Sequence, residues 1–151
     1  MNDRKLTILL AEDDDGHATL LRRNLDRTHI DAEVLRMRNG QEILDYLAPS
    51  AAENPPTVPV LVLLDISMPK VDGIEVLRRI KADPATRAIP VYMLTTTDNP
   101  LEIERCFDLG CNAYVTKPIA YDAFILAIQR LCGFLEITQL PRTTQIQNVA
   151  T

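Results

Sequence analysis

The sequence lacks the features that mark several classes of protein. No basic run is longer than two residues and the formal net charge is −5, so no nucleic-acid surface is predicted and no DNA is expected as a partner. No apolar run approaches the roughly 18 residues that a membrane-spanning helix needs, so no membrane is expected either. Acids directly follow a short apolar run near the start, unlike a secretory signal peptide. A cytoplasmic location is therefore expected.

Residues that build thiol, metal or nucleotide sites are also scarce. The three cysteines, Cys106, Cys111 and Cys132, are odd in number and lack metal-ligand spacing, so we expect small buried side chains in a reducing compartment. His17 and His29 have no second ligand beside them, and we interpret both as structural. Neither the GxGxxG nor the GxxxxGK[ST] pattern occurs, which disfavours nucleotide binding.

Among the features that are present, the segment 59–69, PVLVLLDISMP, organises the chain. Its apolar run, Val60–Leu64, is too short for a membrane span and too continuous for a half-exposed strand, so it indicates a central strand of a parallel sheet, covered on both faces. Asp65 ends the run at the carboxyl edge of that strand. A carboxylate there is either a turn residue or part of the crevice in which open α/β sheets bind ligands, and this strand alone does not decide between them.

Strand and helix patterns alternate along the chain, beginning with a strand. Apolar runs predict strands at 6–11, 31–37, 60–64, 89–94 and 112–116, the second being more polar and so nearer the sheet edge. Helical spacing predicts helices ending near residue 28, around 43–47, from 74 to before 84, over 101–109 and over 121–131. In the fourth helix, Ile103, Cys106 and Phe107 are expected to face inward.

The alternation predicts one α/β domain over residues 1–133, with helices on both faces of a five-stranded parallel sheet. The length suits the doubly wound, flavodoxin-like (βα)5 arrangement, although the order of the strands cannot be read from the sequence. The proline-rich segment 49–59 is predicted to be a surface loop, because proline disfavours helix and strand interiors.

Polar residues stand at the ends of four predicted strands. Glu12 and Asp13 follow the first, Asp65 the third, Thr95 the fourth and Lys117 the fifth. Parallel strands share one carboxyl edge, so these side chains are expected to meet there. Clustered carboxylates repel one another unless a cation keeps them ionised, and Mg²⁺ prefers such oxygen ligands. With Mg²⁺ and Lys117 the site suits a phosphoryl group, and Asp65 is the candidate nucleophile for an aspartyl-phosphate.

The segments LLAEDDD, LVLLDISMPKVDG, MLTTT and YVTKP, in this order and spacing, resemble the receiver domains of two-component response regulators, in particular stand-alone, CheY-like receivers. The resemblance covers about residues 4–133. It implies that Asp65 accepts phosphate from a sensor histidine kinase and that phosphorylation switches protein–protein contacts, with no enzymatic action on a free substrate. It further implies a Mg²⁺ site in which Asp13 is a direct ligand and Glu12 acts through water, with Asp65 and the Ser67 carbonyl as further ligands.

The same resemblance assigns roles to the remaining polar residues. Lys117 would pair with the phosphoryl oxygens, and its bond to Pro118 would be a cis peptide. Thr95 would move to hydrogen-bond the phosphoryl group, and Tyr114 would swing inward behind it as the switch. Phosphorylation, which adds charge and three acceptor oxygens, would order the loop at 95–100.

Two other functions remain open from the residues. A phosphatase of small molecules on the same sheet edge would need a second acid two residues after the nucleophile as general acid, and Ser67 stands there instead. A pseudo-receiver that binds proteins without being phosphorylated would be expected to have lost an acid or the lysine, and this chain keeps both.

After Gly133 the sequence is FLEITQLPRTTQIQNVAT, and these 18 residues are too few for an output domain. Its apolar residues, Phe134, Leu135, Ile137 and Leu140, either cover the end of the last helix or pack on a partner. We favour a homodimer through the last helix and this 134–151 extension. The proline loop and tail resemble those of regulators partnered with bacterial phytochromes, which implies a light-regulated histidine kinase as phosphodonor.

Overall fold

The computed structural model describes residues 6–27, 31–48, 60–68, 70–96, 98–117, 120, 122–123, 125–127 and 129–131. Strands and helices alternate as the sequence predicts. The strands are β1 (Leu6–Ala11), β2 (Ala32–Met37), β3 (Val60–Leu64), β4 (Val91–Thr95) and β5 (Ala113–Thr116). The helices are α1 (Asp15–Asp26), α2 (Gly40–Leu47), α3 (Gly73–Ala82) and α4 (Pro100–Leu109).

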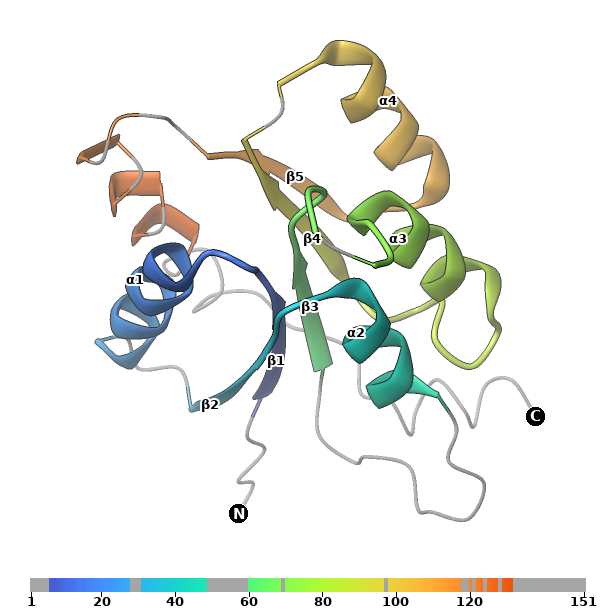
Figure 1. The fold of residues 1–151 in the computed structure, drawn as a ribbon, viewed down its shortest axis with the longest axis horizontal. Helices are drawn as coiled ribbons and strands as arrows, with labels where there is room; N and C mark the ends of the chain where they lie inside the picture. The colour runs from blue at the N-terminus through green and yellow to red at the C-terminus, as the bar shows by residue number, and fades with distance from the viewer. Residues whose placement is uncertain are drawn as a thin grey trace.

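The five strands form one parallel sheet in the order β2-β1-β3-β4-β5. This is the strand order of the flavodoxin-like, doubly wound fold, so the predicted fold class is confirmed. The more polar β2 lies at an edge, as its composition indicates. Figure 1 shows α2, α3 and α4 on one face of the sheet, and α1 with the helical residues that end at 131 on the other.

The central strand β3 is buried on both faces because its side chains alternate between two hydrophobic cores. Val62 and Leu64 pack in the core under α2, α3 and α4, together with Leu77 and Cys106. The alternate residues of β3 pack in the core under α1. The second core contains Ala18, Leu21, Leu25, Leu61, Leu63 and Leu131. A continuous apolar run is what a strand covered by helices on both faces requires.

Side chains at the carboxyl edge of the sheet start the helices. Asp14 is the N-cap of α1 and accepts a hydrogen bond from the His17 backbone N–H at 3.0 Å. Asp72 caps α3 in the same way by accepting from the Glu75 N–H at 2.9 Å. These caps satisfy backbone donors that lack partners within the helix and place the first turns of α1 and α3 beside the strand ends.

The structure corrects one inward-facing residue and one boundary. Phe107 is 50% exposed, because the buried side of α4 runs through Cys106 and only partly includes Ile103. The fourth strand begins at Val91 rather than at Ile89, whose N–H instead bonds the Thr86 carbonyl in a turn at 2.9 Å.

Several predictions concern residues at the margins of the described chain. Residues 122–123, 125–127 and 129–131 are helical, but Tyr121, Phe124 and Ile128 of the predicted stripe lie outside the described residues, as do His29, Cys132 and the 134–151 extension. Cys106 and Cys111 are buried and free, as expected. Within the described ranges, no helix combines the length and apolar character that crossing a membrane requires.

Candidate functional site

Four strand ends bring acidic, hydroxyl and ammonium groups to one edge of the sheet. Glu12 and Asp13 follow β1, Asp65 follows β3, Thr95 ends β4 and Lys117 follows β5. One ligand oxygen from each of the three acids lies within 4.8 Å of the others. These residues lie up to about a hundred positions apart in the sequence. The fold brings their side chains into one site.

Lys117 is the centre of this cluster, and its side chain is almost completely buried. The residue is 3% exposed, and its Nζ donates to Glu12 Oε1 and, at 3.2 Å, to Asp65 Oδ2. The Lys117 backbone N–H also bonds the Thr95 carbonyl at 2.6 Å, which fixes the residue where β5 leaves β4. The ammonium thus bridges the ends of β1 and β3.

The charge balance of the site favours a bound cation. Glu12 and Asp65 are 2% and 7% exposed, whereas Asp13 is exposed to solvent. Burial raises the pKa of Glu12, and the Lys117 ammonium opposes that rise by hydrogen bonding and charge. The cluster holds three carboxylates and one ammonium, so a hard divalent ion with oxygen ligands such as Mg²⁺ fits the residues present.

Thr95 presents a buried hydroxyl to the same edge. The residue is 0% exposed, and its Oγ1 has no hydrogen-bond partner within the described part of the chain. Leaving a buried polar group unsatisfied costs about 1–3 kcal/mol, so such a group is a candidate for pairing with a ligand or with a second conformation of its surroundings.

Two other described residues have expected roles, Ser67 in the loop after β3 and Tyr114 within β5. The Ser67 backbone N–H donates to Asp65 Oδ1 at 3.2 Å, so the loop after β3 orients the aspartate. Tyr114 is half-buried against the core under α4, and burial raises its pKa to about 12. Pro118 lies outside the described residues, and so does the expected cis bond.

His17 belongs to the site, although we interpreted it from the sequence as structural. Its Nδ1 lies 3.1 Å from Lys117 Nζ and 3.9 Å from Glu12 Oε2. Burial lowers the pKa of His17, and the charge of Lys117 lowers it further. The missed signal was positional: α1 begins at the carboxyl edge, so a residue in its first turn can reach the end of β5.

Arg36 of the edge strand is a second residue that sequence reasoning missed. Its Nε donates to the Glu12 carbonyl at 2.9 Å, and its Nη1 bonds Asp15 at the start of α1. The side chain is only 16% exposed. Arg36 therefore holds both ends of the short loop that carries Asp13.

Replacing Arg36 by alanine is expected to weaken Mg²⁺ binding about tenfold, because groups that orient metal ligands typically contribute that much to affinity. Isothermal titration with Mg²⁺ measures the change. Among the described residues, the exposed Arg38 side chain bonds only Asp15, at 3.2 Å, so Arg38→Ala is the matched control. Equal affinities in wild type and Arg36→Ala would remove the proposed role of Arg36.

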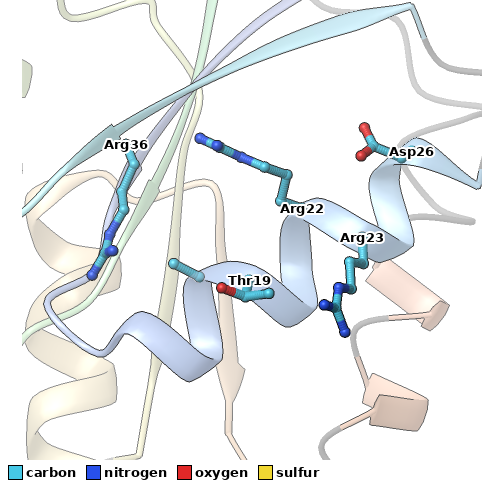
Figure 2. Close-up of a pocket in the computed structure, with 6 residues that line it drawn as sticks. Thr19, Arg22, Arg23, Asp26 and Arg36 are labelled. Carbon is cyan, nitrogen blue, oxygen red and sulfur yellow. The ribbon is translucent and has the colours of Figure 1, made fainter.

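A separate pocket of about 220 Å³ lies between α1 and β2. Figure 2 shows that Arg22, Arg23 and Asp26 project from α1 in different directions and that Arg36 turns toward the loop before α1. Arg22 donates to the Val34 carbonyl at 3.2 Å. Because these side chains do not converge on one point, we assign the functional site to the acidic edge and not to this pocket.

Comparison with known proteins agrees with the fold. Response regulator Rcp1 of Synechocystis is 36% identical over 136 residues, covering 89% of this chain and 92% of that protein. The polar-differentiation response regulator DivK of Brucella anthropi is 35% identical, covering 84% and 96%.

Solved structures show the same similarity. A response regulator receiver domain from Rhodospirillum rubrum has a TM-score of 0.82 and 41% identity, covering 89% of this chain and 96% of that one. The phosphorylated cyanobacterial phytochrome response regulator RcpA has a TM-score of 0.79 and 33% identity, covering 91% and 99%. The family model for the response regulator receiver domain matches residues 8–129, and the chain belongs to this family.

Proposed function

We propose that this chain is a phosphoacceptor switch of the cytoplasm that receives a phosphoryl group on Asp65 from a sensor histidine kinase. One observation carries the proposal: three carboxylates have ligand atoms within 4.8 Å of one another at the carboxyl edge of the sheet, and two of them, Glu12 and Asp65, contact the buried Lys117 ammonium. A site built only to stabilise the fold has no need for this many acids in one place. Acting on its own aspartate, the protein has no free substrate.

The chemistry assigned to Asp65 is an in-line transfer. A carboxylate oxygen forms the new O–P bond while the P–N bond to the kinase histidine breaks, and the electron pair of that bond stays on the imidazole nitrogen. Lys117, 3.2 Å from Asp65 Oδ2, is placed to donate to the phosphoryl oxygens. Positioning and charge stabilisation of this kind supply most of the catalysis in phosphoryl transfer.

Mg²⁺ is the proposed cofactor, with Glu12, Asp13, Asp65 and the Ser67 carbonyl as its protein ligands. The acidic cluster supports this assignment, and a structure of the relative Rcp1 has been solved in its Mn²⁺-bound form, with a TM-score of 0.80 and 32% identity to this chain. When bound, the ion neutralises charge on the phosphoryl oxygens.

The proposed switch couples the site to the surface through Thr95 and Tyr114. The Thr95 hydroxyl, which is buried and has no hydrogen-bond partner among the described residues, would gain one when phosphoryl oxygens arrive. Movement of Thr95 toward the phosphoryl oxygens would change the space next to β4. Tyr114 lies on the neighbouring strand β5 and is half-buried, so its side chain can change position in response. The altered surface would then bind a different protein partner.

Phosphotransfer from a kinase tests the proposal. A purified histidine kinase carrying radiolabelled phosphate is mixed with wild type, with Asp65→Asn, and with Asp108→Asn as a control at an exposed acid of α4. Label is expected on wild type and on the control but not on Asp65→Asn. Absence of label on wild type with every kinase tried would favour a protein-binding pseudo-receiver.

A bacterial phytochrome is the proposed kinase. The support is the names of similar proteins: RcpA is a phytochrome response regulator, and RPA3017 of R. palustris, which acts in red light signalling, has a TM-score of 0.71 and 31% identity to this chain. Phosphotransfer that changes between red and far-red illumination of the kinase is expected.

The proposed dimer depends on the last helix and the 134–151 extension. Ending the chain after Gly133 is expected to convert a dimer into a monomer, because the apolar side chains of the extension are lost. Sedimentation equilibrium of both chains measures the mass, and an unchanged dimer would exclude the extension as the interface.

A further inference from the structure

The Lys117 ammonium has one hydrogen for each of three acceptors. An ammonium carries three donors and no acceptor. Lys117 Nζ reaches Glu12 Oε1, Asp65 Oδ2 at 3.2 Å and His17 Nδ1 at 3.1 Å. A fourth strong acceptor can therefore be served only if one of these three is released.

His17 is the weakest of the three acceptors. Because the ammonium only donates, Nδ1 of the imidazole accepts, and its ring proton must be on Nε2. The two carboxylates are charged and bind an ammonium more strongly than a neutral ring nitrogen does. They come from the ends of β1 and β3, whereas His17 lies on the first turn of α1 and is partly open to solvent.

We propose that His17 is a positioning residue that accepts the third hydrogen of Lys117 while Asp65 is unphosphorylated and gives it up to a phosphoryl oxygen when Asp65 is modified. The inference rests on the proposed function of Asp65. It explains how a buried ammonium can be fully hydrogen-bonded in the resting state and still be available to phosphate. In the unphosphorylated protein, His17 Nδ1 accepts the Lys117 hydrogen that a phosphoryl oxygen accepts after modification.

This exchange has a kinetic consequence. In wild type, the Lys117–His17 hydrogen bond breaks as the new hydrogen bond to phosphate forms. The free energy lost with the first bond therefore offsets part of the free energy gained from the second. Without an acceptor at His17 the resting state is less stable, while the transition state is unchanged. One net hydrogen bond corresponds to a change of about fivefold, so removal of the acceptor is expected to accelerate phosphoryl uptake by roughly that factor.

The test compares His17→Leu, which keeps volume and removes the acceptor, with His17→Asn, whose side-chain oxygen can take the place of Nδ1. Thr19→Leu at an exposed position of α1 is the control. First-order uptake from acetyl phosphate with Mg²⁺ is followed by intact mass. Faster uptake in His17→Leu, with rates near wild type in His17→Asn and Thr19→Leu, is expected.

A second readout does not depend on phosphorylation. Nitrogen-15 spectra of the His17 ring are expected to show the Nε2–H form, with an Nδ1 resonance that shifts when Lys117 is replaced by methionine. An Nδ1–H form would overturn the inference, as would equal or slower uptake in His17→Leu. Wild type that takes up no phosphoryl group would instead contradict the proposed function itself.

Discussion

Replacing Lys117 by methionine is expected to lower the free energy of unfolding by about 3–5 kcal/mol near neutral pH without a divalent cation. The substitution keeps the apolar stem but removes the charge that faces Glu12 and Asp65. Both carboxylates are nearly inaccessible to water, so each is left as a buried charge without a counter-ion. Equilibrium unfolding in urea measures the loss.

The pH dependence of this variant has a defined sign. Burial already raises the pKa of Glu12 above its ordinary value of 4.5, and Lys117 opposes that rise. The folded state of Lys117→Met therefore holds the Glu12 proton to higher pH than the unfolded state does. Its stability is expected to be highest below the unfolded pKa and to fall as pH rises through the folded pKa.

Two controls identify the cause. Adding Glu12→Gln to Lys117→Met removes one of the two carboxylates left without a counter-ion and is expected to recover part of the free energy of unfolding. Millimolar Mg²⁺ is expected to stabilise Lys117→Met more than wild type, because the cation replaces a missing positive charge. A loss below about 1 kcal/mol in the single variant would show that the buried ion pairs contribute little.

Replacing Gly73 by alanine is expected to destabilise the fold by on the order of 3 kcal/mol, the upper end of the range for overpacking. A Cβ on Gly73 would lie 2.1 Å from the Asp65 carbonyl oxygen and 2.7 Å from Ile66 Cα. Both neighbours are backbone atoms and cannot rotate away. The loop after β3 must shift, and with it the Asp65 side chain, so phosphoryl uptake should also fall.

Gly16→Ala is the matched control for this prediction. Gly16 lies in the first turn of α1, and the nearest atom to a new Cβ is Asp14 Oδ1, at 3.2 Å and on an exposed side chain. Alanine favours a helix over glycine, but its Cβ crowds the Asp14 oxygen that caps α1, so stability is expected to change by no more than about 1 kcal/mol in either direction. Thermal unfolding of both variants tests the pair, and equal effects would contradict the close-approach argument.

Much of the fold could be predicted because its signals are local. The apolar run of β3 indicates a strand covered on both faces, and the acid that ends it fixes where the carboxyl edge lies. Glu12, Asp13 and Lys117 follow other strands at the same relative position, so a parallel sheet places them on one edge, and the order β2-β1-β3-β4-β5 makes β1 and β3 neighbours there.

The residues that were misjudged depend on contacts between distant elements. His17 touches Lys117 one hundred positions away, and Arg36 touches the Glu12 carbonyl from the edge strand. Neither contact leaves a pattern of spacing in the sequence. Phe107 was placed inward by helical spacing alone, but the width of the buried side of α4 is set by how the helix lies on the sheet.

Phosphorylation of Asp65 is tested by intact mass after incubation with acetyl phosphate, with and without Mg²⁺, for wild type and Asp65→Asn. Wild type is expected to gain one phosphoryl group with Mg²⁺, and this gain is expected to disappear in Asp65→Asn and without the cation. No gain in wild type, or an equal gain in Asp65→Asn, would contradict the proposed phosphorylation of Asp65.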